Sequence, residues 1–372
     1  MARLRAFPSA LRRSPGFSLV EILVAMAIGL IGMLMMARMT ESWEARKRSS
    51  AYSGDAQVSG SIALYRLTQD IRLAGYGFGT SDKVGCIVRA YDSARSAPNF
   101  IFPMAPVVIT DGGGGAPDNI TVLYGDSPSI SADISFTEAT DFTLKTEAGA
   151  SRIGIRKGDL VIATSSTNAT ECELFEITDN TNTDALTLNH NIGDYVDFMG
   201  FPATARYNPA TPAVDLTSGG GGILNMGLVP RRNTWQIDSG LLQSRNELRY
   251  VDFDGDGSHD WAQIADGIID LQAEYGLDTD GDTIIDTWNA LVPGTWSQVR
   301  AVRVALLARS QQYEKTAVTT TAPAWTGGDF VMTNVDGTAD TTPNDTNDWR
   351  RYRYRVYETV IPLRNMLWGT AP

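Results

Sequence analysis

Gly16-Phe-Ser-Leu-Val-Glu21 opens the stretch of sequence that decides how this chain is built, because an apolar run follows it to Ala37. Residues 1–16 are basic, with four arginines and no acidic residue. From residue 17 to 37 only Glu21 is charged, and a helix of that length spans about 32 Å, which is one bilayer core. Arginines that precede such a segment stay in the cytoplasm. We therefore expect a transmembrane helix over 17–38 with the rest of the chain on the opposite side of the membrane.

Three interpretations of this N-terminus compete. A secretory signal peptide has an uninterrupted apolar centre and a small-residue cleavage site, whereas here Glu21 interrupts the run and Met35–Met39 is a poor site. A plain membrane anchor gains nothing from a carboxylate, which costs a few kcal/mol near hydrocarbon and is by default functional. The third interpretation accounts for Glu21: the string from Gly16 to Glu21 resembles the processing site of type IV prepilins and pseudopilins.

This resemblance gives each residue of the string a role. Residues 1–16 are then a leader that a prepilin peptidase/N-methyltransferase removes after Gly16, and Phe17 becomes the methylated amino terminus. In a filament core of packed apolar helices, the uncompensated carboxylate of Glu21 seeks the positive amino terminus of a neighbouring subunit, and this attraction is stronger in low dielectric than in water.

After the anchor the chain continues as a helix and then turns to strands. Leu64, Leu67, Ile71 and Ala74 follow helical spacing, so we expect an amphipathic helix over 39–77, although a plain helical linker is an alternative. The remainder, 78–372, is expected to be a β-rich extracytoplasmic domain with long loops. The candidate strands are Asn119–Tyr124, Leu160–Ala163, Leu186–Leu188, Leu248–Val251, Ile268–Tyr275, Val299–Ala308 and Tyr352–Val360. A helix followed by antiparallel strands predicts an α+β fold.

Three further segments narrow the resemblance to PilW-type minor pilins: Leu67–Tyr76, Glu274–Asp282 and Glu358–Asn365. It implies a pilin-like fold, in which one long N-terminal helix packs on an antiparallel sheet. It also implies a subunit that joins other minor pilins and the major pilin to prime assembly of a type IV pilus. Residues 85–245 carry no motif that we recognise.

Composition and motifs argue against nucleic-acid binding and catalysis. The net charge of −12 repels phosphate, and removal of the leader takes basic residues from an already acidic body. The alternating bases and aromatics of Arg350–Tyr357 could serve single-stranded nucleic acid, but a strand with Tyr352, Tyr354 and Val356 packed inward is the simpler interpretation. The chain has only two histidines, His190 and His259, and lacks GxSxG, HExxH and phosphate-loop motifs, so we expect no enzyme.

Two segments carry aspartates at the spacing of calcium ligands. The second is the better candidate, and both have acids at positions 1, 3, 5 and 9 of an EF-hand-type loop. Position 12, which is usually glutamate, is Gln263 or Asn289, so we expect an affinity for Ca²⁺ that is modest or that relies on a more distant ligand. The alternative is a pair of solvated Asp-Gly turns. The candidate ligands are Asp252, Asp254, Asp256 and Asp260 in the first loop and Asp278, Asp280, Asp282 and Asp286 in the second.

Cys86 and Cys172 are the only cysteines. Outside the cytoplasm a disulfide between them is favoured over two free thiols, and their spacing supports neither zinc nor a redox motif.

The resemblance implies a structural subunit, a minor pilin of the inner membrane with a periplasmic body that moves to the pilus and cell surface. Twitching motility and cell adhesion would follow from its assembly. Two alternatives stay open: a minor pseudopilin of a type II secretion system, and a pilus-tip adhesin whose central region binds a ligand.

Overall fold

The structure is a computed structural model that describes residues 16, 18–78, 83–128, 133–147, 154–167, 170–179, 187–338 and 347–367. The chain divides into two compact units, Met1–Tyr52 and Ser53–Pro372. The first unit contains the N-terminal part of a long helix. The second contains the remainder of that helix and all of the strands.

The helix α1 extends from Leu19 to Leu73 without interruption. No proline lies between Pro15 and Pro98, so nothing removes a backbone donor along its length. The helix ends four residues before the predicted boundary at residue 77. Gly75 adopts a positive φ of 75° there, and the Asn365 side chain donates to the carbonyl oxygens of Leu73 and Ala74 at 3.2 and 3.0 Å. Asn365 thus supplies donors that the last turn of α1 lacks.

One face of α1 packs into the core of the second unit. Leu67 and Ile71 are fully buried, as is Ala74 directly after the helix, and Leu64 is half-buried, as the helical spacing predicted. The stripe continues through Gly60, where the Tyr357 ring lies so close that a β-carbon would collide with it. The Tyr357 hydroxyl donates to the carbonyl oxygen of Gln57 at 3.1 Å.

A single carboxylate also fixes α1 to the strands. Asp70 accepts hydrogen bonds from the Tyr124 hydroxyl at 2.9 Å, the Asn233 amide at 2.8 Å and the Trp235 indole at 2.8 Å. Burial, and then the nearby carboxylate, raise the pKa of Tyr124 well above its usual value, so that its hydroxyl stays a donor. The helix therefore has both an apolar stripe and a polar attachment point.

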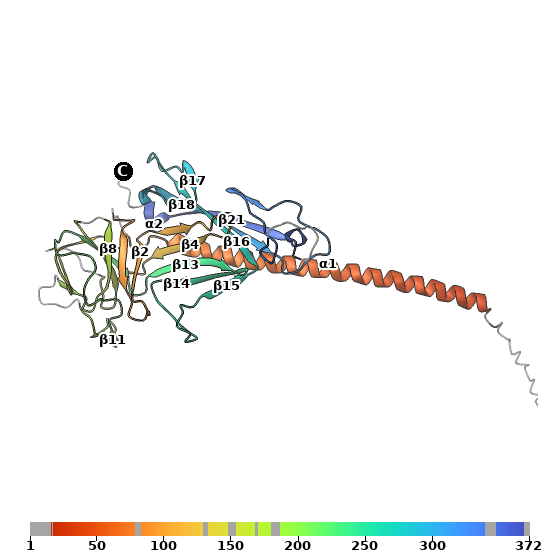
Figure 1. The fold of residues 1–372 in the computed structure, drawn as a ribbon, viewed down its shortest axis with the longest axis horizontal. Helices are drawn as coiled ribbons and strands as arrows, with labels where there is room; N and C mark the ends of the chain where they lie inside the picture. Colours follow the sequence, from red (N-terminus) through yellow and green to blue (C-terminus); the bar gives the residue numbers. More distant parts are fainter. Residues whose placement is uncertain are drawn as a thin grey trace, which may run out of the picture. The chain divides into compact units, whose positions relative to one another are not determined.

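Two antiparallel sheets meet the buried face of α1, and Figure 1 shows β4, β13 and β16 beside the helix. The five-stranded sheet has the order β15-β14-β13-β4-β3, and the four-stranded sheet has the order β17-β16-β18-β21. The first comprises β3 Val107–Thr110, β4 Asn119–Tyr124, β13 Arg231–Asp238, β14 Leu241–Asn246 and β15 Ala262–Asp266. The second comprises β16 Ile268–Leu277, β17 Thr287–Asn289, β18 Val299–Arg309 and β21 Tyr354–Pro362.

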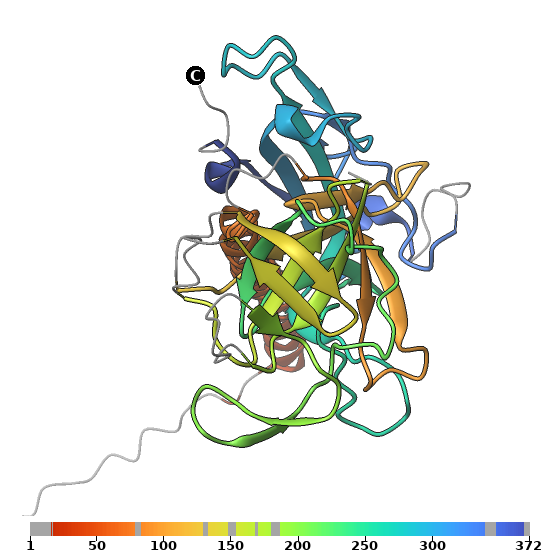
Figure 2. The ribbon, with the colours of Figure 1, turned by 90° about the vertical axis from the view of Figure 1, so that its left-hand side faces the viewer.

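The central region forms a separate eight-stranded sheet, with the order β2-β1-β8-β7-β12-β5-β6-β9. In Figure 2 its β5–β6 hairpin is yellow and faces the viewer, and β1 and β2 are orange. β1 pairs with β8 in parallel, and the other pairs are antiparallel. Its strands are β1 Ile87–Tyr91, β2 Asn99–Pro103, β5 Ile134–Thr140, β6 Thr143–Thr146, β7 Leu160–Thr164, β8 Glu171–Glu176, β9 Thr187–Asn189 and β12 Gly222–Gly227.

Most of this sheet is an insertion. β4 and β13 are neighbours in the five-stranded sheet, yet residues 125–230 separate them in the chain and contain β5 to β12. The insertion has apolar residues on both faces, since Leu160 and Ile162 of β7 join one cluster while Val161 and Ala163 join another. The remaining elements are the small hairpins β10 Asp194–Val196 with β11 Pro202–Thr204 and β19 Ala324–Trp325 with β20 Gly328–Asp329, the 3-10 turns Trp296–Gln298 and Trp349–Arg351, and the short helix α2 Arg364–Leu367.

Most of the predicted strands are confirmed. Asn119–Tyr124 is β4, and the strands expected near Leu160, Ile268, Val299 and Tyr352 are β7, β16, β18 and β21. The strand expected at Leu186–Leu188 corresponds to β9, which begins at Thr187, and Leu186 itself lies outside the described residues. The strand predicted at Leu248–Val251 was wrong.

Leu248 lies in a turn after β14. Its amide donates to the Asn246 side-chain oxygen at 3.1 Å, which replaces a ladder hydrogen bond, and its buried side chain packs against the eight-stranded sheet instead. The structure is mostly β-sheet with an apolar N-terminal helix, and this arrangement is compatible with the predicted α+β class.

Candidate functional site

The beginning of α1 is a reciprocal capping box. The Ser18 amide donates to Glu21 Oε2 at 3.0 Å, and the Glu21 amide donates to Ser18 Oγ at 3.2 Å. This satisfies two amide donors that a helix start leaves without a partner, and the S-x-x-E spacing that announces it is visible in the sequence. Within the single chain, Glu21 therefore caps its own helix. Gly16 lies exposed before the cap, and Phe17 lies outside the described residues.

The apolar part of this helix can cross a membrane by length and composition. It covers Leu19–Glu41 and has a mean hydropathy of 2.4. The carboxylate of Glu21 thus lies at the N-terminal end of the apolar stretch, where the helix dipole favours negative charge.

The second aspartate loop joins β16 to β17 and is closed by its own aspartates. Asp278 accepts from the amides of Gly281 and Thr283 at 2.7 and 3.1 Å. Asp286 accepts from the amide and hydroxyl of Thr279, both at 2.7 Å. One oxygen from each of Asp278, Asp280 and Asp282 lies within 4.8 Å of the others, whereas Asp286 is not part of that group.

The first loop lies between β14 and β15 and repeats this hydrogen-bond pattern. Asp252 accepts from the amides of Gly255 and Gly257 at 2.6 and 2.9 Å, and Asp260 accepts from the Phe253 amide. Oxygens of Asp252, Asp254 and Asp260 lie within 4.8 Å of one another. Asp256 is outside that group and accepts from the Ser258 amide at 2.7 Å. The two loops therefore share one pattern of backbone hydrogen bonds, although their sequences differ between the aspartates.

The two loops differ in charge compensation. Arg300 donates to Asp278 Oδ2 from Nε at 2.9 Å and from a terminal nitrogen at 2.8 Å, and both side chains are buried. Burial opposes ionisation of Asp278, but the hydrogen bonds from Arg300, Gly281 and Thr283 outweigh it and lower the pKa. A cation at the second loop competes with Arg300, so the geometry favours the first loop, the reverse of the preference from sequence.

Calcium binding stays a prediction, and thermal unfolding of the full chain in detergent tests it. An ion that binds only the folded state stabilises it by about 2.7 kcal/mol when its concentration is a hundredfold above Kd. We expect the melting temperature to rise in calcium and fall in chelator. The double change Asp254→Asn with Asp252→Asn should remove most of that response, and Asp280→Asn with Asp282→Asn should remove less.

Asp280 and Asp282 each accept a backbone amide with one oxygen, which asparagine keeps, so the change at the second loop should relieve repulsion without destabilising the protein in chelator. Asp252 accepts amides with both oxygens, so the change at the first loop also removes one acceptor and is expected to cost some stability in chelator. An identical melting temperature in calcium and in chelator for the unaltered chain would leave both loops as plain turns.

The rest of Glu274–Asp282 has clear structural roles. Glu274 pairs with Arg303 on the neighbouring strand β18, and the Arg303 guanidinium lies 4.6 Å from the Trp288 ring centre and 5.2 Å from that of Trp325. The Tyr275 hydroxyl accepts a hydrogen bond from the Ile109 amide at 2.6 Å, which joins the four-stranded sheet to β3. This segment therefore fastens the sheets that pack on α1.

The two cysteines form a disulfide, Cys86–Cys172, with a Cα–Cα distance of 6.0 Å. Cys86 directly precedes β1 and Cys172 lies in β8, so the bond reinforces the parallel pair of the eight-stranded sheet.

Arg350–Tyr357 is a strand only from Tyr354 onward, because Arg350 and Arg351 lie in a 3-10 turn, but the expected alternation of burial is present. Tyr352 is buried and Tyr354 and Val356 are half-buried, whereas Arg353 and Arg355 are exposed. Arg353 pairs with Glu314 at 3.1 Å.

The two histidines lie in different surroundings. His190 is buried against Phe175, and burial lowers its pKa to about 4, so it is neutral at ordinary pH. His259 lies in the first aspartate loop, with its ring tilted against that of Tyr250 at 5.2 Å between ring centres.

Comparisons with known families match both ends of the chain. Residues 11–37 match the prokaryotic N-terminal methylation motif, and residues 237–365 match the type IV pilus-assembly protein W. The second match begins at the end of β13 and includes the aspartate loops, β16, β18 and β21. Leu67–Tyr76, which suggested the same family, lies in neither match. No curated protein and no solved structure matches the chain.

These matches, together with the apolar N-terminal helix, support a pilin with a prepilin signal and a membrane-anchoring helix, related to the type IV pilus. More particularly, the chain is PilW-like. Pilin-type families are structural rather than catalytic.

Proposed function

We propose that this protein is a minor pilin that takes part in assembling, and in priming, a type IV pilus. The observation that supports it is the presence on one chain of the methylation motif at 11–37 and the pilus-assembly match at 237–365. The capped apolar helix between Gly16 and Glu41 is the kind of segment that a filament of packed helices requires.

The proposal assigns a role to each part of the chain. Residues 1–16 are the leader, 17–38 the transmembrane and filament-core helix, 39–77 the amphipathic helix and 78–372 the β-rich body in a pilin-like fold. The peptidase cuts after Gly16 and methylates Phe17 in the inner membrane, with the body in the periplasm. The partners are other minor pilins and the major pilin.

Glu21 has two possible partners in this proposal. In the single chain its carboxylate accepts from the Ser18 amide, and in the filament it also meets the positive amino terminus of Phe17 on a neighbouring subunit. The cap contributes about 1 kcal/mol to the helix end. The charge pair lies in a low-dielectric core, where an uncompensated carboxylate is costly.

Complementation of a deletion strain tests the proposal. The deletion should reduce surface filaments, and the unaltered chain should restore them and appear in sheared filaments with cross-linked minor pilins. Glu21→Ala should be cleaved and inserted normally but incorporated poorly. Ser18→Ala removes only the hydroxyl half of the cap and keeps the carboxylate, so its incorporation should stay near normal.

Removal of the leader is tested in the same strains by measuring the molecular mass of the protein. Gly16→Leu should keep the 16-residue leader, because the peptidase must fit the residue before the cleaved bond. The control Gly29→Leu, inside the helix, should be cleaved and lose the leader. Normal filament numbers in the deletion strain would overturn the proposed role in assembly. Equal incorporation of Glu21→Ala and the unaltered chain would remove the proposed charge pair.

A further inference from the structure

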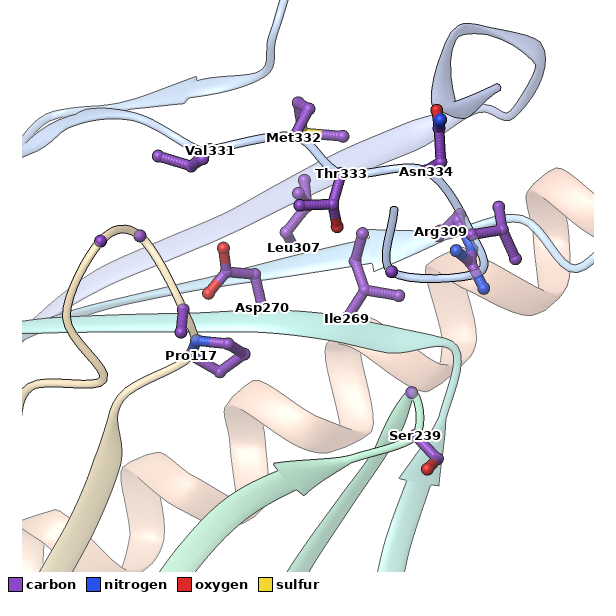
Figure 3. Close-up of a pocket in the computed structure, with 16 residues that line it drawn as sticks. Pro117, Ser239, Ile269, Asp270, Leu307, Arg309, Val331, Met332, Thr333 and Asn334 are labelled. Atoms are coloured by element: carbon purple, nitrogen blue, oxygen red, sulfur yellow. The ribbon is translucent and has the colours of Figure 1, made fainter. Parts of the chain in front are cut away.

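A cavity of about 670 Å³ lies on the outer face of the four-stranded sheet, opposite the face that packs on α1. Its floor is formed by Ile269 and Asp270 of β16 and Leu307 of β18, and one wall is the Gly114–Pro117 loop between β3 and β4. The other wall is the segment that carries Val331 and Met332, and the Val331 side chain meets the loop at Gly115 (Figure 3). This volume is typical of sites for small ligands.

Asp270 reaches this cavity because the strand is irregular there. The register of β16 against β18 shifts between Ile268 and Asp270, so an extra residue is accommodated at this point. Such bulges redirect side chains and are common beside functional sites. Figure 3 shows the Asp270 carboxylate between Pro117 and the segment of Val331.

The Asp270 carboxylate is desolvated without a compensating cation. The residue is only 5% exposed, and one oxygen accepts from the Gln272 amide at 3.0 Å. Burial raises the pKa of Asp270 to about 6, and the carboxylate of Asp118 adds to this effect, whereas hydrogen bonds from Gln272 and Leu271 oppose it. Among the described residues, no basic side chain contributes to lowering it. At neutral pH the cavity therefore contains an uncompensated, largely buried negative charge.

The remaining lining residues of the cavity restrict which ligands can bind beside Asp270. Arg309 lies toward the other end of the cavity in Figure 3, and its guanidinium is 5.1 Å from the Tyr352 ring centre. The turn Ser239–Gly240 and the segment from Val331 to Val335 bring no charged side chain to the lining. A single carboxylate is too few ligands for a divalent metal ion. The walls offer apolar surface from Ile269, Leu307 and Met332.

We propose that this cavity binds an organic cation with a short alkyl stem, an alkylguanidinium or alkylammonium group, whose charged end pairs with Asp270. The stem packs between Leu307 and Met332, and repulsion from Arg309 keeps the charged end at the Asp270 side. A free amine and a basic side chain of a neighbouring protein both carry this chemistry. The inference is independent of the role of the chain in pilus assembly.

Calorimetric titration of the full chain in detergent with n-butylguanidinium tests the proposal. We expect saturable binding at pH 7.5, at least tenfold stronger than that of n-pentanol, which has an apolar stem but no charge. N-acetylarginine N-methylamide distinguishes the sources: binding equal to that of n-butylguanidinium indicates a side chain presented by another protein, and binding of the simple cation alone indicates a free amine.

Asp270→Asn keeps the shape of the side chain and should weaken binding at least tenfold. Asp215→Asn is the matched control, because Asp215 is exposed, its carboxylate accepts from Thr217 and it is not part of the cavity lining. This variant should bind as the unaltered chain does. In the unaltered chain the affinity should fall about tenfold from pH 7.5 to pH 5, since the carboxyl group becomes protonated through about pH 6. The pH series needs no variant, so it remains informative if Asp270→Asn does not fold. Absence of binding, or equal affinity in Asp270→Asn and at both pH values, would overturn the proposal.

Discussion

Replacing Cys86 and Cys172 together by alanine is expected to lower the free energy of unfolding by about 4 to 5 kcal/mol. The disulfide joins residues separated by 86 positions, and a cross-link over a loop of that size removes much conformational freedom from the unfolded chain. Both cysteines are also buried in an apolar cluster with Val88 and Leu174, so the substitution leaves a small cavity as well.

Denaturant unfolding of the full chain in detergent measures this effect. The unaltered chain kept in a reductant that opens the bond is the control, and it should show most of the same loss because it lacks the cross-link but keeps the side chains. Equal midpoints for the double variant and the oxidised chain would show that the eight-stranded sheet does not depend on the bond.

Arg303→Met is expected to cost about 3 to 5 kcal/mol of stability. Arg303 is nearly buried, donates to Glu274 and lies against the rings of Trp288 and Trp325. Removing the arginine leaves the Glu274 carboxylate largely buried without a cation, and this desolvated charge is the main cost. The variant also loses the stacking between the guanidinium and two rings.

A double variant separates these causes. Glu274→Leu combined with Arg303→Met removes both charges, so it should be more stable than Arg303→Met alone by several kcal/mol. Arg353→Met is the matched control: Arg353 pairs with Glu314 near the surface, and its loss should cost less than about 1 kcal/mol. If the double variant is as unstable as the single one, packing against the tryptophans, and not the unpaired carboxylate, decides the effect.

The sequence predicted those parts of the fold that depend on neighbouring residues. The spacing of Leu67, Ile71 and Ala74 located the buried stripe of α1, because side chains three or four residues apart share a helix face. The strands around Ile268 and Val299 were predictable from their apolar content. The cap at Ser18 was equally local and could have been found from the S-x-x-E spacing.

Features made by residues distant in sequence were not predictable. Nothing near β4 indicates that its sheet neighbour β13 begins at Arg231, after an insertion with its own sheet. Both aspartate loops could be located from the sequence. The pairing of Asp278 with Arg300 of β18 could not, and this ion pair makes the first loop the better candidate for a cation site. The position of Asp270 in a cavity depends on the bulge in β16 and on the segment Val331–Val335, and neither is indicated by a local sequence pattern.

The contact between Tyr357 and the helix has a consequence for biosynthesis. The Tyr357 hydroxyl donates to Gln57 across 300 residues of chain, and Asn365 caps the end of α1. Ribosomes add about 5 to 20 residues per second, so roughly 15 to 60 s pass between synthesis of these two partners. During that interval the buried stripe of α1 has no β21 beside it. The nascent chain is therefore most exposed to proteolysis and aggregation before its last residues leave the ribosome.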